Sequence, residues 1–387
     1  MQVEIKKYSS FEVLPDSYLH LFAKAADERY DYSLPWFQNF ARTALDHDDQ
    51  ICIYGVEENG TNTPLAILVT RFKAMTRGIF SPARISSLSN FYTITYGPLG
   101  EFSEGRSTQA LGMLAAALAA DHRWDLVELR PLDPQALIYP NLLQAFRNAG
   151  MVVQPYFCFG NWYLPTVGLS YEAYFKTLPS AIQNTIRRKS KKLEKTGRAR
   201  IDLVTGAEGV EPAIEAYEKI YLSSWKRPEP FPNFVPGLVR TCAEKGWLRM
   251  GVVYMDDQPI AAQVWIVNAR KATIYKLGHD QRFDEFSAGS ILTTKLIEYV
   301  LEVDRVHEID FGSGDDSYKK NWLSQRRERW GIVAMNPRTF RGCLSILCNV
   351  GGRELKNVWK RITDPGRAAH SNPAPDQMLA PSDGSTV

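Results

Sequence analysis

The sequence predicts an α/β fold of two consecutive domains, each with a mixed central sheet flanked by helices. Three observations support this prediction. The 387 residues are enough for two domains of ordinary size. Hydrophobic residues make up 44% and charged residues 23% of the chain, which is typical of a soluble globular protein with a substantial core. Strands and helices are predicted in the same order in the two halves, although the halves share no visible sequence identity.

The first half begins with helical periodicity over residues 16–45, where Pro35 fits the first turn of a second helix. Alternating residues at 51–56 and 65–71 flank Glu58-Asn-Gly60, which favours a β-hairpin. The remaining elements are expected in the order strand, helix, strand, helix and strand, over residues 85–96, 107–122, 126–129, 135–149 and 152–163. We therefore expect a first domain over residues 1–165.

The second half repeats this order. It is expected to contain a helix, a strand, two helices and three strands, over residues 180–195, 200–204, 210–224, 234–245, 247–255, 259–268 and 272–278. A second domain is accordingly expected over residues 166–362. The last residues, 363–387, are rich in Pro, Ser, Ala and Gly and are expected to form a disordered tail.

A strand–helix–strand unit at residues 271–323 organises the second half. A polar turn at 279–290 leads into a helix whose apolar residues recur at positions 292, 296, 299, 300 and 303. A second strand at 308–312 closes the unit, which predicts two parallel strands joined by a right-handed crossover. The turn places backbone N–H groups at a helix N-terminus, an arrangement suited to binding an anion.

This unit resembles the GNAT superfamily of acyl-CoA N-acyltransferases, in its cellulose-biosynthesis (CelD-like) branch, which is related to the FemABX aminoacyltransferases. The resemblance covers about residues 170–335 and rests on three segments: Ser287-Ala-Gly-Ser290, Asp310-Phe-Gly-Ser-Gly-Asp315 and Tyr318-Lys319. It implies tandem GNAT-like (FemABX-like) domains and acetyl-CoA as co-substrate. The turn departs from the usual GNAT phosphate signature, a Gln or Arg followed by spaced glycines, because only Gly289 stands there.

The turn supplies five candidate residues for binding the phosphates of acetyl-CoA. Arg282 adds a positive charge, Ser287 can cap the helix, and Gly289 allows close approach of the backbone. Ala288 and Ser290 complete the first helical turn. The alternative is an ordinary capped helix start, and the resemblance favours the phosphate site.

Acyl transfer to an amine requires one group that removes a proton from the amine and one that protonates the leaving thiolate. The sequence contains no Gly-x-Ser-x-Gly motif and no Cys–His motif, so direct attack is expected. Asp310 lies in an apolar strand where burial would raise its pKa, which makes it the candidate base, with a structural ion pair as the alternative. Glu308 and His279 are further candidates. The resemblance assigns the role of acid to Tyr318.

Candidate contacts to the acceptor lie on a basic helix at residues 180–197 and at two other positions. Arg187 and Lys191 belong to a dense cationic face, which is either solvated or binds an anion: a substrate phosphate, an anionic lipid or RNA. Trp225 stands beside cations, which suits stacking on a sugar, with packing in the core as the alternative. Lys319 is expected in a solvated turn or in contact with the substrate.

We expect an N-acyltransferase that moves an acetyl group from acetyl-CoA to an amine. The resemblance points to an amino sugar of an exopolysaccharide or cell-envelope precursor as acceptor, including a lipid-linked saccharide. The alternatives are a FemABX-like transferase that uses aminoacyl-tRNA and a non-catalytic scaffold of a polysaccharide-synthesis machine.

Net charge and cysteine content lead to expectations about the binding partners and the cellular compartment of the protein. The net charge of +3 gives no indication of a nucleic-acid partner. Five cysteines without paired or metal-like spacing predict a reducing compartment and no metal site. No apolar signal core is visible at the start, so we expect a cytoplasmic protein, with peripheral contact at the inner face of the membrane.

Overall fold

The structure is a computed structural model that describes residues 3–60, 63–73, 81–100, 102, 106–224 and 226–349. The elements of its first half are β1 (Val3–Tyr8), α1 (Asp16–Ala26), η1 (Tyr30–Tyr32), α2 (Leu34–Thr43), β2 (Asp49–Glu58), β3 (Thr63–Lys73), β4 (Arg84–Ser87), β5 (Leu99–Gly100), α3 (Arg106–Ala120), β6 (Leu126–Leu132), α4 (Ile138–Asn148) and β7 (Val152–Pro165).

The elements of the second half are α5 (Tyr171–Thr177), α6 (Ser180–Glu194), β8 (Ala199–Val204), α7 (Val210–Ser223), α8 (Phe234–Glu244), β9 (Leu248–Met255), β10 (Gln258–Asn268), β11 (Lys271–His279), η2 (Gln281–Phe286), α9 (Ala288–Glu302), β12 (Glu308–Asp310), η3 (Lys319–Asn321) and β13 (Gln325–Met335). Most helices and strands lie where the sequence predicted them. The predicted tail at 363–387 lies outside the described residues.

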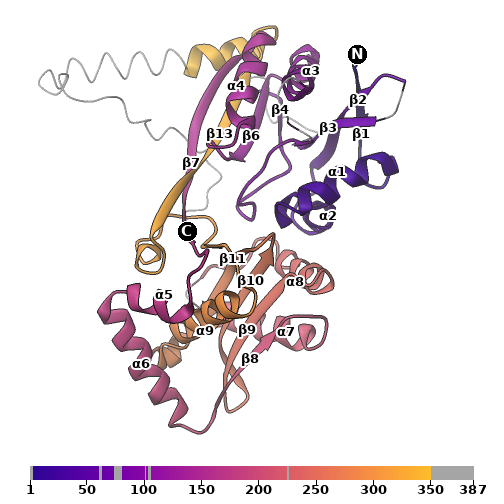
Figure 1. Cartoon of the computed structure of the whole chain (residues 1–387). Coiled ribbons are helices and arrows are strands. Elements are labelled where there is room, and N and C mark those ends of the chain that lie inside the picture. Colours follow the sequence, from indigo (N-terminus) through magenta and orange to yellow (C-terminus); the bar gives the residue numbers. More distant parts are fainter. Residues whose placement is uncertain are drawn as a thin grey trace, which may run out of the picture.

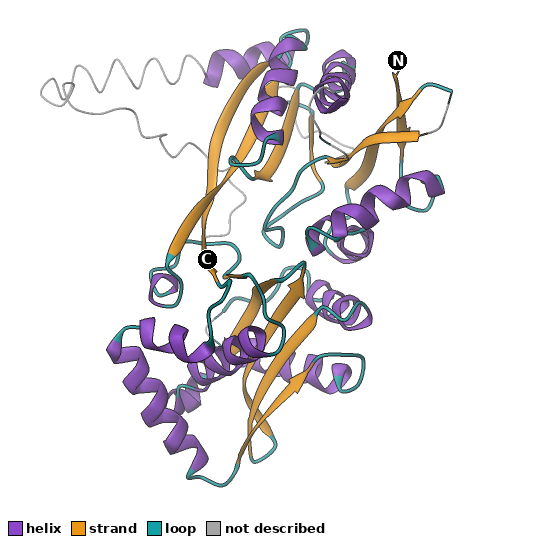
Figure 2. Cartoon of the chain, in the orientation of Figure 1, coloured by secondary structure: helices purple, strands orange, loops and turns teal. Residues whose placement is uncertain are grey.

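Within the described residues, thirteen strands form one mixed sheet (Figures 1 and 2). Their order is β1-β2-β3-β4-β6-β13-β7-β12-β11-β10-β9-β8, with β5 paired to β3. The order is a mirror image about the central pair β13–β7. Helices α1 and α2 follow β1 as α7 and α8 follow β8, and α3 precedes β6 as α9 precedes β12. The predicted α/β fold, with the same order of elements in both halves, is therefore confirmed.

The central strands tie the two halves together. β13, which comes from the end of the second half, pairs antiparallel with β7 from Gln325↔Tyr163 to Met335↔Val152. Its other edge pairs with β6. β7 in turn pairs with β12. The two predicted domains thus exchange strands at the centre of a shared sheet.

Alternation along the strands divides the core of the second half into two layers. On β10, Ala262 and Val264 belong to the apolar cluster that contains α7 and α8 and extends into the first half. Ala261 and Trp265, which flank this pair on either side, join the cluster formed with α5, α6 and α9. Helices α7 and α8 accordingly cover one face of this part of the sheet, and α5, α6 and α9 cover the other (Figure 2).

Helices α2 and α8 join the halves on one side of the sheet. Asn39 donates a hydrogen bond to the carbonyl oxygen of Phe234 at 3.1 Å, and Trp36 packs edge-on against Phe234 with ring centroids 5.4 Å apart. A Cβ atom at Gly237 would lie 2.1 Å from the side-chain oxygen of Asn39, so the close approach of the two helices requires glycine there.

Candidate active site

The two parallel strands of the predicted strand–helix–strand unit diverge after a short pairing. β11 pairs with β12 only from Lys271↔Glu308 to Thr273↔Asp310, yet β11 continues to His279. Beyond β12 the chain bends away at Gly312, where φ is +63° and an added Cβ would lie 3.3 Å from the carbonyl oxygen of Ile274. From residue 274 onward, the edge of β11 that faces β12 is therefore no longer paired with β12. We call it the free edge of β11.

Two adjoining cavities lie at this divergence. The smaller, of about 290 Å³, is lined by residues 274–277 of β11 and residues 311–313 after β12. The larger, of about 1200 Å³, extends to the start of α9 and to the loop 226–230. The cavities share six lining residues, which we call the junction: Phe91, Lys226, Lys276, Leu277, Asp316 and Tyr318.

The start of α9 forms one end of the larger cavity. Ser287 has a left-handed backbone (φ 53°, ψ 42°), which turns the chain from η2 into α9. Ser287, Gly289 and Ser290 line the cavity, whereas Ala288 is buried in the core. Gln263 donates a hydrogen bond to the carbonyl oxygen of Gly289 at 2.9 Å, which fixes this turn against β10. First-turn N–H groups have no partner within their own helix, so they are suited to an anion.

Two details of the predicted cofactor turn are wrong. The side chain of Ser287 makes no capping hydrogen bond, because its left-handed backbone does not present the hydroxyl to the first turn. Arg282 does not belong to the lining of the cavity, and its guanidinium forms an ion pair with Asp280 at 2.5 Å. Arg227 does line this cavity and has no ion-pair partner within the described part of the chain.

His279 ends β11 and lines the larger cavity. Its Nε2 lies 3.0 Å from a carboxylate oxygen of Asp284, and its ring lies against the start of α9, since a Cβ at Gly289 would be 3.5 Å from Nδ1. His279 is therefore placed beside the predicted phosphate site rather than at the junction.

Asp310 does not have the environment that the sequence predicted. Its side chain is buried, and its oxygens accept hydrogen bonds from Asn161 at 2.6 Å, from the backbone of Gly312 at 2.7 Å and from Arg327 at 2.6 Å. Burial opposes ionisation, but the positive charges of Arg327 and Lys271 outweigh it and hold the pKa of Asp310 below its usual range. The predicted rise in pKa is wrong.

Glu308, the reserve candidate for the base, is also held in ion pairs. Its carboxylate lies 2.7 Å from Arg327 and 2.9 Å from Lys271. It shares Arg327 with Asp310, so both carboxylates belong to one network beneath the divergence of the strands.

Tyr318 and Lys319 follow β12 in the loop that closes the smaller cavity. Tyr318 belongs to the junction, and burial raises its pKa to about 12. Lys319 is buried, and its Nζ donates hydrogen bonds to the carbonyl oxygens of Ser313 at 2.7 Å, Phe311 at 3.1 Å and Gly314 at 3.2 Å. These bonds assign Lys319 to shaping the loop after β12, where the sequence predicted a solvated turn or contact with the substrate.

The junction also contains a network that the sequence did not predict. Glu229 accepts hydrogen bonds from the hydroxyl of Tyr92 and from Nζ of Lys276, the latter at 2.5 Å. Nζ of Lys226 donates to the carbonyl oxygen of Leu277 at 2.5 Å. Burial and, second, the charge of Lys276 lower the pKa of Lys226 to about 8. The neighbouring Trp225, a predicted substrate contact, lies outside the described residues.

The first half contributes to this site through the loop that contains Phe91 and Tyr92. Tyr92 stacks on Phe234 of α8 with ring centroids 4.1 Å apart, and its carbonyl oxygen accepts a hydrogen bond from Tyr275 at 2.8 Å. Phe91 projects into the junction and is 54% exposed. No local sequence pattern marks these residues, because their position depends on packing between the halves.

The basic helix α6 uses its cations in two ways. Lys189 and Lys192 both contact Glu285 in η2, through its carbonyl oxygen and its carboxylate at 2.5 Å each. Arg188, Lys191 and Lys195 are exposed and have no ion-pair partner in the described ranges. The spacing of these three cations, i, i+3 and i+7, places them on one face of the helix, which we call the α6 stripe.

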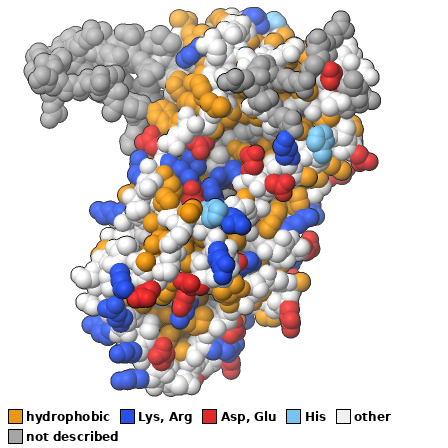
Figure 3. All heavy atoms as spheres, viewed as in Figure 1, with side chains coloured by type: hydrophobic (Ala, Val, Ile, Leu, Met, Phe, Trp, Pro, Cys, Tyr) orange, Lys and Arg blue, Asp and Glu red, His pale blue; other side chains and the backbone are white. Residues whose placement is uncertain are grey.

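Arg187, a predicted substrate contact, lies beside the α6 stripe. Its guanidinium stacks over the ring of Phe175 at 5.2 Å, so part of its role is to pack α6 against α5. Basic side chains gather along the lower left margin of the surface, over α6 (Figure 3).

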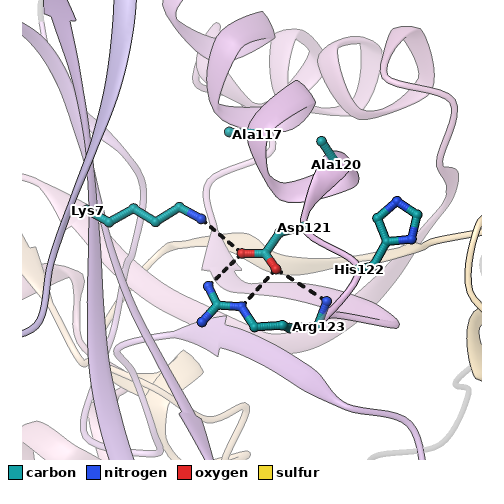
Figure 4. A pocket seen from close by; sticks show the side chains of 6 residues that line it. All are labelled: Lys7, Ala117, Ala120, Asp121, His122 and Arg123. Atoms are coloured by element: carbon teal, nitrogen blue, oxygen red, sulfur yellow. Dashed lines mark hydrogen bonds and ion pairs between the residues drawn. The ribbon is translucent and has the colours of Figure 1, made fainter.

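A further depression, of about 690 Å³, lies between β1 and the end of α3 and is lined by Lys7, Ala117, Ala120, Asp121, His122 and Arg123 (Figure 4). Asp121 accepts hydrogen bonds from Arg123 at 2.7 Å and from Lys7 at 2.9 Å. These contacts, chiefly that of Arg123, hold the pKa of Asp121 well below its usual range. Both cations are paired with this one carboxylate, so this is an ion-pair cluster that joins β1 to the end of α3.

The described residues contain no group of three or more His, Cys, Asp or Glu side chains arranged to hold a metal ion. They also contain no helix that is both long and apolar enough to cross a bilayer.

Comparison with known proteins gives a family match for the second half and a fold match for most of the chain. Residues 180–320 match the model of the acetyltransferase (GNAT) domain. No curated protein matches the chain. The crystal structure of FemX shares 10% identity over 78% of this chain and 90% of its own, with a TM-score of 0.52.

Two other solved structures have the same fold. One is the C-terminal domain of a protein assigned as a lysylphosphatidylglycerol synthetase from Agrobacterium fabrum, with 11% identity over 85% of this chain and 95% of that one and a TM-score of 0.50. The other is a conserved protein from Bacteroides thetaiotaomicron, with 8% identity over 86% and 100% and a TM-score of 0.55. Residues 180–320 thus match the GNAT acetyltransferase domain in sequence, and the surrounding chain has the FemX-like fold.

Proposed function

We propose that this chain is an N-acyltransferase that uses acetyl-CoA, with the donor in the larger cavity and the acceptor amine in the smaller one. The observation that carries the proposal is the divergence of β11 and β12 in front of the N-terminus of α9. The free edge of β11 offers backbone groups to the amides of an extended pantetheine arm. The first turn of α9, with Ser287, Gly289 and Ser290 at the cavity wall, offers N–H groups to the pyrophosphate.

The junction is the place where the two ligands meet. An amine bound in the smaller cavity attacks the thioester carbonyl, and the C–S bond breaks with the electron pair on sulfur. Tyr318 lies in this wall, and its raised pKa keeps the phenol protonated, so it can donate its proton to the thiolate. His279 lines the larger cavity beside Gly289, at the turn proposed to bind the phosphates.

We propose an amino sugar of an exopolysaccharide or cell-envelope precursor, carried on a lipid, as the acceptor. Phe91 presents a half-exposed aromatic ring at the junction, which suits the apolar face of a sugar. The three cations of the α6 stripe repel one another in the isolated helix. An anionic membrane surface would offset this repulsion by about 1 kcal/mol for each cation near it. One neighbouring structure, assigned as a lysylphosphatidylglycerol synthetase, also bears a name that refers to a lipid product.

A transferase that uses aminoacyl-tRNA is the second candidate, because FemX shares the fold and the α6 stripe also suits a phosphate backbone. A scaffold without activity is the third. Thermal denaturation with acetyl-CoA, with aminoacyl-tRNA and without ligand distinguishes them, because only a ligand of the native state raises its stability. The proposal predicts a rise in Tm with acetyl-CoA alone. A rise with aminoacyl-tRNA alone supports the second candidate, and no rise with either supports the scaffold.

A further inference from the structure

Lys226 stands where a donor in the larger cavity and an acceptor in the smaller cavity would meet. It lines both cavities, and its Nζ is held 2.5 Å from the carbonyl oxygen of Leu277, on the free edge of β11. Its stem passes the ring of Tyr221 on α7, with Nζ 5.7 Å from the centroid. We propose that Lys226 is the general base that takes the proton from the acceptor amine. This inference rests on the function proposed above.

The other ionisable groups of the junction are less suited to this role. Nζ of Lys276 is already bound to the carboxylate of Glu229 at 2.5 Å, and this ion pair opposes the lowering of its pKa by burial. Asp316 is largely exposed and lies 3.4 Å from Nζ of Lys319. The pKa of Tyr318 is raised to about 12, so its phenol is protonated at neutral pH and can act as an acid but not as a base. Of the predicted bases, Asp310 is fixed by Arg327. His279 lies 3.0 Å from a carboxylate oxygen of Asp284 and lines the larger cavity but not the smaller one.

The surroundings of Lys226 make its neutral form accessible near neutral pH. Burial is the main cause of the lowered pKa of about 8. Lys276 on β11 and Lys319 after β12 lower it further, whereas Glu229 and Asp316 oppose the shift. A base is most effective when its pKa is close to the working pH, and buried lysines are tuned to about 7–8 for this purpose.

In the proposed reaction, Lys226 and Tyr318 each transfer one proton. Neutral Lys226 takes one proton from the acceptor ammonium, which frees the nitrogen lone pair for attack on the thioester carbonyl. The C–N bond forms, the C–S bond breaks, and Tyr318 gives its proton to the departing thiolate. The amide nitrogen then gives up its second proton, which restores Tyr318, and Lys226 releases the first proton to solvent. No oxidant, reductant or metal is required.

Competitive labelling of the full chain with acetic anhydride tests the state of Lys226 without any other ligand. Trace labelling at a series of pH values from 6 to 11, read by peptide mass spectrometry, gives the pH at which each lysine becomes reactive. Lys219, exposed on α7 and outside both cavities, is the matched reference. We expect a midpoint near 8 for Lys226, below the value of about 10.4 for a lysine side chain in a model peptide. A midpoint for Lys226 equal to that of Lys219 would overturn the proposal.

Incubation with acetyl-CoA in the absence of acceptor tests the position of Lys226. A neutral Nζ beside the thioester is itself acetylated, so we expect acetyl on Lys226, formed faster as pH rises through 8 and suppressed by excess CoA. Lys226→Arg keeps the positive charge but cannot act as a base, and we expect it to lower transfer to glucosamine at least 100-fold, while Lys219→Arg retains full activity.

Calorimetric titration with acetyl-CoA separates the two proposals. If acetyl-CoA binds but Lys226 is never acetylated by it, the role of Lys226 is overturned and the function stands. If acetyl-CoA does not bind at all, the proposed function fails, and the role of Lys226 fails with it.

Discussion

In the first half, β4 and β6 pair in parallel from Arg84↔Leu126 to Ser86↔Glu128, as β11 and β12 do in the second half from Lys271↔Glu308 to Thr273↔Asp310. The chains then take different courses. After β4, the hydroxyls of Ser87 and Ser89 both bond to the carbonyl oxygen of Arg130 at 2.7 Å, which keeps the segment beside β6. After β12, by contrast, the chain bends away from β11 and the junction cavities open.

Residues further beyond β4 also keep this segment beside β6. The backbone N–H of Tyr96 bonds to the carbonyl oxygen of Pro131 at 2.7 Å, and its ring, like that of Tyr92, is buried. The predicted strand at 85–96 is accordingly short: β4 ends at Ser87, and the residues after it form a loop. The same arrangement of strands thus has two forms: in the second half it opens onto the two cavities, and the loop of the first half supplies part of their wall.

A second correspondence explains Asp310. Glu128 occupies the same position in the pairing of the first half, is buried, and lies 2.8 Å from Arg84, just as Asp310 lies 2.6 Å from Arg327. The pKa of each carboxyl is held below its usual range despite burial. A carboxylate paired with an arginine thus occurs at this position in both halves, with and without the cavities, which favours a structural role for Asp310.

The largest expected effect concerns Tyr318, which lies in the cavity wall of the second half. We expect Tyr318→Phe to lower transfer of acetyl to glucosamine by the 10²–10⁴-fold typical of a general acid. Thermal stability should change little, because the side chain is 43% exposed. Thiol release and thermal denaturation measure the two quantities. Tyr299→Phe, at the other end of α9, is the matched control, and equal activity in both variants would remove Tyr318 from the mechanism.

The paired carboxylates should affect stability in both halves. Asp310→Asn removes one of the two carboxylates that share Arg327, and Glu128→Gln leaves the part-exposed Arg84 without its ion-pair partner. We expect each change to lower the free energy of unfolding by about 1–3 kcal/mol. Denaturant unfolding at neutral pH measures this loss. The wild type should lose the same contribution as pH falls below about 4, since both folded pKa values are lowered. A stable but inactive Asp310→Asn would restore Asp310 as a catalytic residue.

Much of the fold could be predicted from local pattern, whereas the site depended on distant contacts. The hairpin around Glu58-Asn-Gly60 and the helix after Ser287 are local, and both predictions are confirmed. The environment of Asp310 was not predictable, because Arg327 lies 17 residues further on, in a strand whose pairing the sequence does not reveal. Phe91 reaches the junction only because the two halves pack together.

Lys226, at the junction, should make the free energy of unfolding depend on pH. The pKa of Lys226 is lowered to about 8 in the folded protein, against about 10.4 when unfolded, so the unfolded state binds more protons between these values. The unfolding free energy of the wild type, relative to Lys226→Met, should therefore rise by up to about 3 kcal/mol from pH 8 to pH 10. Urea unfolding across this range is the measurement. A constant difference would show that Lys226 titrates normally.

The smallest expected effect concerns α6, a helix that follows β7 in the chain. Reversing two cations of the α6 stripe, as Arg188→Glu with Lys191→Glu, should weaken binding to phosphatidylglycerol vesicles by at least about 10-fold, given roughly 1 kcal/mol per cation. Lys219→Glu with Lys245→Glu changes the net charge equally and should bind as the wild type. Loss of acetyl-CoA affinity in the first variant would place α6 in the donor site instead.

The number and position of acetyl-CoA molecules bound to the chain test the contrast between the halves most directly. Isothermal titration should give one site per chain. Gly289→Val should abolish it or weaken it more than 10-fold, because a branched side chain at the start of α9 obstructs approach to the first turn. Gly112→Val in α3, the corresponding helix of the first half, has open space at its Cβ and should bind normally. Two sites per chain, or loss of binding in Gly112→Val with retention in Gly289→Val, would contradict the account.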